Sequence, residues 1–314
     1  MSPTNNNKTT SDRNPKFSVT AQNIRKKYGD VEALRGISFD VFKGELFGII
    51  GPDGAGKTTL FRILTTLALA GEGTASVEGL DVEKDYKEIR KRVGYMPGRF
   101  SLYQDLSVEE NLRFFATLFN TTIKENYDLV KDIYNQLEPF KERRAGALSG
   151  GMKQKLALSC ALIHKPDVLF LDEPTTGVDP VSRKEFWEML RRLKEQGITI
   201  LVSTPYMDEA TLCDRIALIR DGQFLKINTP ATIISEFQET LWSVRSSDMP
   251  QLLRDLREHP SVKSAFAFGD VHHITVCQGF TTNELKRYLA EKGHEDVEIE
   301  GIEANIEDCY MGLE

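Results

Sequence analysis

Residues 51–59 read GPDGAGKTT, which fits the pattern G-x-x-x-x-G-K-[ST] of a phosphate-binding loop, the P-loop. The apolar run ELFGII precedes the loop at residues 45–50, and LFRILTTL follows it at residues 60–67 with the apolar spacing of a helix. The motif requires a strand, a glycine-rich loop and a helix in this order. A glycine-rich turn that matched the motif by chance would not need a strand before it and a helix after it. We therefore expect a phosphate site formed by Gly51, Pro52, Asp53, Gly54, Ala55, Gly56, Lys57, Thr58 and Thr59.

The chemistry of the loop gives its residues distinct roles. Glycines let the backbone curl so that successive N–H groups point at phosphate oxygens, and the helix start adds a partial positive charge. Lys57 is expected to reach the β- and γ-phosphates, and Thr58 to bind Mg²⁺. Asp172 ends the apolar run VLFL, where a carboxylate can hold Mg²⁺ through water, and Glu173 is placed to activate a water. Acids at strand ends can also simply cap a turn, which is the structural alternative for both.

Composition narrows the class of protein. The chain has 314 residues, 28% of them charged and 40% hydrophobic, which is typical of a soluble protein of about two domains. No apolar run approaches the roughly 18 residues that indicate a membrane span, and the start lacks the apolar core of a signal peptide. The net charge of −7 argues against general nucleic-acid binding. Cys160, Cys213, Cys277 and Cys309 form no C-x-x-C pair, which favours free thiols in a reducing cytosol.

The chain divides into three parts. Residues 1–15 are rich in Asn, Thr and Ser and are expected to be disordered. Residues 16–235 alternate strands and helices in an α/β pattern, with a largely helical insertion that a capping box opens at residues 107–110. Residues 240–314 read as βαββαβ, the order of a small α+β ferredoxin-like domain.

Three motifs together are specific: GPDGAGKTT, LSGGM at residues 148–152 and VLFLDEP at residues 168–174. Residues 16–235 thereby resemble the ATP-binding subunit of an ATP-binding-cassette (ABC) transporter of the exporter type. The resemblance implies a P-loop NTPase fold with a mixed sheet, an antiparallel β subdomain and a helical subdomain. It also implies binding of ATP and Mg²⁺, with Thr58 and Asp172 on the metal and Glu173 as the catalytic base.

The resemblance assigns further residues to the nucleotide. Ser149, Gly150 and Gly151 look like the signature that contacts the γ-phosphate held by a second subunit, and amides at a helix start suit an anion. The segment TTGVDP at residues 175–180 looks like the D-loop of the same interface. Tyr28 looks like the aromatic residue that stacks on adenine. Covering a sheet is the simpler interpretation of Tyr28.

Two positions depart from the family pattern. Gly98 stands where the family has a glutamine that helps to hold Mg²⁺ and the attacking water. Pro205 stands where the family has a histidine that contacts the γ-phosphate, and proline offers no donor. Neither Gln104 nor Tyr206 is an obvious substitute. Because γ-phosphate contacts carry much of phosphoryl-transfer catalysis, these departures motivate a second hypothesis, a nucleotide-gated clamp that hydrolyses ATP weakly.

The first hypothesis is an export ATPase on the cytoplasmic face of a membrane. Its partners are separate membrane-spanning subunits and, as a dimer, a second copy or another cassette. ABC proteins of translation or DNA repair rank lower, because the chain has neither two cassettes nor a coiled-coil insertion. The adjacent His272 and His273 point to opposite faces of a strand and are not expected to chelate one metal. The basic run of Arg90, Lys91 and Arg92 with Arg99 suits a solvated helix face or a docking surface, and Phe114, Phe115 and Phe119 suit the core.

Overall fold

The structure is a computed structural model that describes residues 16–98 and 102–313. It divides into two compact units, residues 1–227 and 228–314. The expected disordered tail and Arg99 lie outside the described residues. No helix within those two described ranges combines the length and apolar character needed to cross a membrane.

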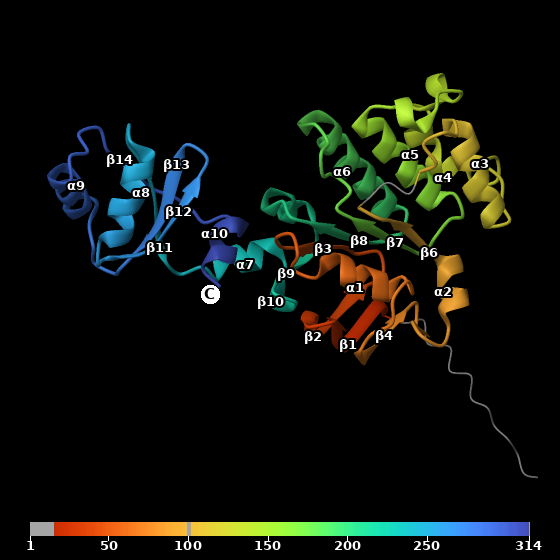
Figure 1. The fold of residues 1–314 in the computed structure, drawn as a ribbon, viewed down its shortest axis with the longest axis horizontal. Helices are drawn as coiled ribbons and strands as arrows, with labels where there is room; N and C mark the ends of the chain where they lie inside the picture. Colours follow the sequence, from red (N-terminus) through yellow and green to blue (C-terminus); the bar gives the residue numbers. More distant parts are fainter. Residues whose placement is uncertain (1–15, 99–101, 314) are drawn as a thin grey trace, which may run out of the picture. The chain divides into compact units, whose positions relative to one another are not determined.

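Unit 1 contains two sheets with a helix between them (Figure 1). The four-stranded sheet has the order β2-β1-β4-β5, and the six-stranded sheet has the order β10-β9-β3-β8-β7-β6. Helix α1 (Lys57–Leu64) contacts β2, β4 and β7, so its apolar residues join both sheets in one core. The strands are β1 (Phe17–Tyr28), β2 (Val31–Phe42), β3 (Leu46–Ile50), β4 (Glu72–Val77), β5 (Leu80–Asp81), β6 (Val93–Met96), β7 (Val168–Asp172), β8 (Thr199–Thr204), β9 (Arg215–Arg220) and β10 (Gln223–Asn228).

The six-stranded sheet places the motifs at one edge. Strand β3 pairs in parallel with β8 and β9, and β7 pairs in parallel with β6 and β8. Parallel strands end at a common edge, where ligands of open α/β sheets bind. The residues that follow β3, β8, β7 and β6 are therefore neighbours. They are Gly51, Pro205, Glu173 and Pro97.

Helices form the expected insertion in unit 1. Figure 1 shows α3, α4 and α5 gathered on the side of the six-stranded sheet away from β1, β2 and β4. Ser107 and Glu110 form the predicted capping box of α3. Phe114, expected in the core, is 41% exposed, so that prediction is wrong for this residue, because it lies on the solvent side of α3. The helices are α2 (Tyr86–Arg92), α3 (Val108–Leu118), α4 (Tyr127–Tyr134), α5 (Gly150–Leu162) and α6 (Pro180–Glu195), with 3₁₀ helices η1 (Glu138–Phe140), η2 (Ala145–Ala147) and η3 (Met207–Leu212).

Unit 2 holds its own sheet and core. Its elements from β11 to β14 follow the order βαββαβ and α10 comes after them, and the sheet order is β12-β13-β11-β14. One face packs against α8 and α9 around a core that includes Val244, Leu252 and Ile274. The elements are α7 (Pro230–Ser235), β11 (Thr240–Arg245), α8 (Met249–Glu258), β12 (Val262–Phe268), β13 (Val271–Val276), α9 (Thr282–Glu291), β14 (Glu298–Gly301) and α10 (Ile306–Met311).

The boundary between the units differs from the sequence prediction. Residues 228–235 were assigned to the cassette but group with unit 2. The reason is that α7 packs on α10, where the Cys309 thiol lies 3.7 Å from the Ile233 carbonyl oxygen. No helix was expected at residues 306–311, and without α10 there was no reason to group residues 228–235 with unit 2.

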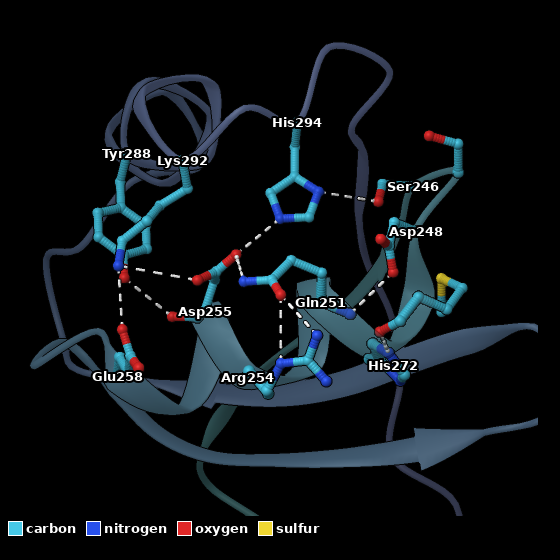
Figure 2. A network of polar contacts seen from close by, with 12 residues as sticks. Ser246, Asp248, Gln251, Arg254, Asp255, Glu258, His272, Tyr288, Lys292 and His294 are labelled. Carbon is cyan, nitrogen blue, oxygen red and sulfur yellow. Dashed lines mark hydrogen bonds and ion pairs between the residues drawn. The ribbon is translucent and has the colours of Figure 1, made fainter.

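Polar side chains also tie unit 2 together (Figure 2). The buried Asp255 carboxylate accepts hydrogen bonds from Gln251 at 3.0 Å and from His294 Nε2 at 2.9 Å. The other His294 nitrogen lies 3.2 Å from Ser246 Oγ. These partners satisfy an acid that would otherwise be costly to bury.

The two adjacent histidines of β13 bond in different directions. His272 Nε2 lies 2.8 Å from the Met249 carbonyl oxygen, and His273 Nδ1 lies 2.7 Å from Asp308 on α10. Their protein partners give both histidines a structural role within unit 2.

Candidate functional site

The P-loop has the backbone that its glycines predict. Every residue of β3 is buried, and the chain turns at Gly51, where a Cβ atom would lie 2.2 Å from the Ile219 carbonyl oxygen. Gly56 has φ +105°, and a Cβ atom there would lie 2.5 Å from the Ala33 carbonyl oxygen. Both positions exclude larger residues, and α1 begins at Lys57 directly after the loop. The first N–H groups of a helix have no partner within the helix, which makes such a start suitable for binding an anion.

Lys57 lies at the centre of the site with its side chain 2% exposed. Its ammonium donates to the carbonyl oxygens of Gly51 at 2.8 Å and Pro52 at 2.9 Å, and lies 3.1 Å from Glu173 Oε1. An ammonium has three donors, and these three oxygens engage them all. Glu173 therefore takes up the third donor of the Lys57 ammonium.

The two acids at the end of β7 have separate environments. Asp172 is buried and accepts a hydrogen bond from Ser203 Oγ at 2.6 Å. Glu173 has φ +51°, and its N–H donates to the Ser203 carbonyl at 3.0 Å, which fixes this uncommon backbone. Burial, helped by the negative charge of Asp172, raises the pKa of the Tyr95 hydroxyl to about 12. Ser203 thus holds both acids, its hydroxyl bonding the Asp172 side chain and its carbonyl oxygen the Glu173 backbone, while the Glu173 carboxylate meets Lys57.

The other predicted residues lie on separate segments. Ser149 caps α5, its Oγ accepts from Met152 N–H at 3.3 Å, and Ser149 and Gly150 are exposed. Gly151 packs closely on α6, since a Cβ atom there would lie 2.7 Å from Ser182 Oγ. Tyr28 ends β1 with 46% exposure, so its ring is accessible for stacking. The structure thus joins the P-loop to Glu173 through Lys57 and leaves Ser149 and Gly150 exposed.

The structure explains one departure from the family pattern, Gly98, and gives the surroundings of the other, Pro205. A Cβ atom at Gly98 would lie 3.0 Å from the Asp172 carbonyl oxygen, which is tighter than ordinary contact, so the backbone here suits glycine. Pro205 follows β8, whose last carbonyl, that of Thr204, accepts from Gly51 N–H at 3.2 Å. Tyr206 lies over the Arg183 guanidinium at 4.6 Å, so its ring has a partner on α6.

Sequence reasoning missed a buried acid beside this edge. Glu209 in η3 accepts hydrogen bonds from Thr175 and Thr204 and pairs with Arg183. Only its position after the run of residues 200–204 could have drawn attention to it.

Comparison with known proteins identifies the family. The family model described as "ABC transporter" matches residues 34–176. The Nod factor export ATP-binding protein I of Burkholderia lata is 36% identical over 307 residues, which cover 95% of this chain and 97% of that protein. The probable multidrug ABC transporter ATP-binding protein YbhF of Escherichia coli (strain K12) is 41% identical over 214 residues. This match covers 68% of the chain but only 37% of the length of YbhF.

A solved structure has the same fold. The dimeric post-hydrolysis ATP-binding cassette MJ0796, bound to ADP and Pi, matches with a TM-score of 0.61 and 25% identity. The match covers 67% of this chain and 98% of that one. Together with the near full-length relative, these likenesses confirm the resemblance found in the motifs. The chain belongs to the family of ABC transporter ATP-binding proteins.

Proposed function

We propose that this chain is the ATP-binding and ATP-hydrolysing subunit of an export system, acting as a dimer on the cytoplasmic face of a membrane beside separate membrane-spanning subunits. The contact between Lys57 and Glu173 at the end of the P-loop carries the proposal, because it brings a phosphate-binding charge and a candidate base to one point. The names of the relatives, a Nod factor export protein and a multidrug protein, support export. ATP turnover that depends on Glu173 tests it.

Each residue of the proposed site has a separate role in the binding or hydrolysis of ATP. P-loop amides and Lys57 bind the phosphates, and the phosphate replaces Glu173 on the ammonium. Thr58 in the first turn of α1 and the buried Asp172 at the end of β7 offer the oxygen ligands that Mg²⁺ prefers, and the metal would neutralise charge on the phosphates. Glu173, released from Lys57, accepts a proton from the attacking water. Ser149 and the exposed amide of Gly150 approach the γ-phosphate held by the second cassette.

The weakly hydrolysing clamp remains the second candidate. Gly98 and Pro205 favour it, since neither supplies a side-chain donor to the γ-phosphate. The intact Glu173 and the exporter names of the relatives favour turnover. We expect slow hydrolysis by the chain alone, below the roughly 1–100 s⁻¹ of kinases.

A groove on unit 1 suits a membrane-spanning partner. It has a volume of about 500 Å³ and lies between α2, α3 and α5. Its lining is mostly apolar, with Phe115 and Phe119 on one wall and Arg90 and Lys91 at the rim. Leu118 at its edge is 61% exposed, and such exposed apolar surface marks interaction sites.

One polar atom in the groove also lacks a partner. His164 lines the groove, its Nε2 lies 3.1 Å from the Val93 carbonyl oxygen, and its Nδ1 is buried without a hydrogen bond in the described structure. Because that nitrogen is buried, an occupant of the groove does not reach it, and from the apolar lining we infer an occupant helix with an apolar face.

Leu118→Glu is expected to abolish this docking, because it places a negative charge in the apolar groove. The measurement is co-purification, from detergent-solubilised membranes, of a protein with several runs of about 20 apolar residues. Leu69→Glu is the matched control, since Leu69 is 64% exposed and does not line the groove. Equal recovery with both variants would place the partner elsewhere.

Unit 2 is expected to be dispensable for nucleotide binding. A chain ending at Asn228 removes α7 together with its partner α10 and cuts no element of unit 1. Its ATP affinity should match that of the full chain within about twofold, since every residue assigned to the nucleotide above lies in unit 1. Calorimetry on both chains measures this. A folded truncation that no longer binds ATP would show that unit 2 contributes to the site.

A further inference from the structure

Glu209 carries a carboxylate that is almost completely buried, with 1% exposure, beside the candidate site. Its Oε2 accepts a hydrogen bond from Thr204 Oγ1 at 2.6 Å, and its Oε1 accepts one from Thr175 Oγ1 at 2.8 Å. Arg183 Nε lies 3.3 Å from Oε1. Two segments, residues 175–183 and residues 204–209, therefore meet through this one side chain.

Each hydroxyl partner lies next to a residue of the proposed reaction. Thr175 comes two residues after Glu173 and begins the segment 175–180. Thr204 ends β8, its Oγ1 accepts from Tyr206 N–H at 3.1 Å, and its carbonyl accepts from Gly51 N–H at 3.2 Å. A shift of Glu209 would thus move the start of segment 175–180, the turn at residues 204–206 and the beginning of the P-loop together.

Stability alone gives little reason for this arrangement. A buried ion pair is often no more stabilising than apolar residues of the same volume, because both charges lose hydration. Here Arg183 is fixed on three sides, by Glu209, by Asp208 and by the ring of Tyr206. A fixed cation and two hydroxyl donors hold the carboxylate in one orientation, which is what accurate positioning requires.

We propose that Glu209 is a positioning residue for ATP hydrolysis, which sets the start of segment 175–180 relative to the end of β8 and the P-loop. This rests on the proposed function. This role is more important in this chain than in relatives with the usual glutamine and histidine, because neither Gly98 nor Pro205 has a side chain that could contact the γ-phosphate. Alignment of Glu173 then depends on the backbone that Glu209 holds.

The sharpest variants remove one hydroxyl and keep the shape. Thr204→Val and Thr175→Val each delete one hydrogen bond to Glu209. Thr199→Val is the matched control: Thr199 is equally buried at the other end of β8, and its hydroxyl bonds Ser18 at 2.7 Å. All three variants lose a buried hydrogen bond, so a general loss of stability affects them alike.

We expect kcat of the full chain to fall roughly 10- to 100-fold in Thr204→Val and Thr175→Val, the size of effect that a displacement of about 1 Å produces. KM for ATP should stay within about twofold, because no phosphate contact is lost. Thr204→Ser and Thr175→Ser should restore kcat, and Thr199→Val should leave it unchanged. Equal kcat in Thr204→Val and Thr199→Val would overturn the proposal.

A second measurement separates this inference from the proposed function. Hydrogen exchange of the full chain without nucleotide should become faster at residues 175–179, the segment that Thr204 meets through Glu209, in Thr204→Val and remain unchanged in Thr199→Val. If the wild-type chain shows no turnover, the proposed hydrolysis is wrong. Hydrogen exchange and ATP-driven dimerisation then show whether Glu209 positions segment 175–180. Unchanged exchange in Thr204→Val would overturn the positioning role in either case.

Discussion

Lys57→Ala is expected to weaken ATP binding roughly 10- to 100-fold, the equivalent of one lost hydrogen bond to a charged group. The Lys57 ammonium donates hydrogen bonds to the carbonyl oxygens of Gly51 and Pro52. No other side chain of the loop carries a positive charge. Calorimetric titration of the full chain with ATP and Mg²⁺ measures the change.

A control keeps this result specific. Lys194 on α6 also pairs with a carboxylate, that of Asp214 at 2.6 Å, but lies outside the P-loop. Lys194→Ala should leave ATP affinity unchanged. If Lys57→Ala binds ATP as the wild type does while its thermal unfolding is unchanged, the phosphate assignment of the loop is wrong.

Glu173→Gln is expected to lower ATP turnover by about 10²- to 10⁴-fold, the usual contribution of a general base. The amide keeps the size of the side chain but cannot accept the proton from water. It also removes the anion that occupies Lys57 in the absence of nucleotide, so ATP binding should persist or strengthen. With hydrolysis blocked, ATP should hold two cassettes together.

Light scattering with and without ATP and Mg²⁺ should show twice the monomer mass for this variant only when nucleotide is present. Glu185→Gln is the control, since Glu185 pairs with Lys155 at 2.7 Å on α5 and not with the P-loop. A strict monomer at high concentrations of protein and ATP would mean that the second cassette is a different protein.

The most predictable parts of the molecule were short motifs whose residues determine their own backbone geometry. The loop at residues 51–59 specifies its backbone through glycines whose Cβ atoms would collide with neighbouring chain, as at Gly51 and Gly56. Apolar runs such as residues 168–171 specify central parallel strands, and Asp172 and Glu173 then reach the carboxyl edge by topology alone. The same features bring Glu173 to within 3.1 Å of Lys57.

Contacts between distant segments were not predictable in the same way. Glu209 bonds Thr175, which lies 34 residues earlier in the chain, and no local sequence pattern predicts that contact. The division at residue 227 depends on α7 packing against α10, about 75 residues later in the chain. Phe114 shows the same limit, because helical spacing does not tell which neighbouring surface covers a face.

The most direct test of the account is the rate of ATP hydrolysis by the purified full chain with Mg²⁺, compared with that of Glu173→Gln and repeated with its membrane-spanning partner. The account predicts slow turnover alone, faster turnover with the partner, and loss of both in the variant. Hydrolysis that survives in Glu173→Gln would contradict the assignment of the base. Tight ATP binding without hydrolysis under either condition would contradict the proposed export ATPase and leave the nucleotide-gated clamp.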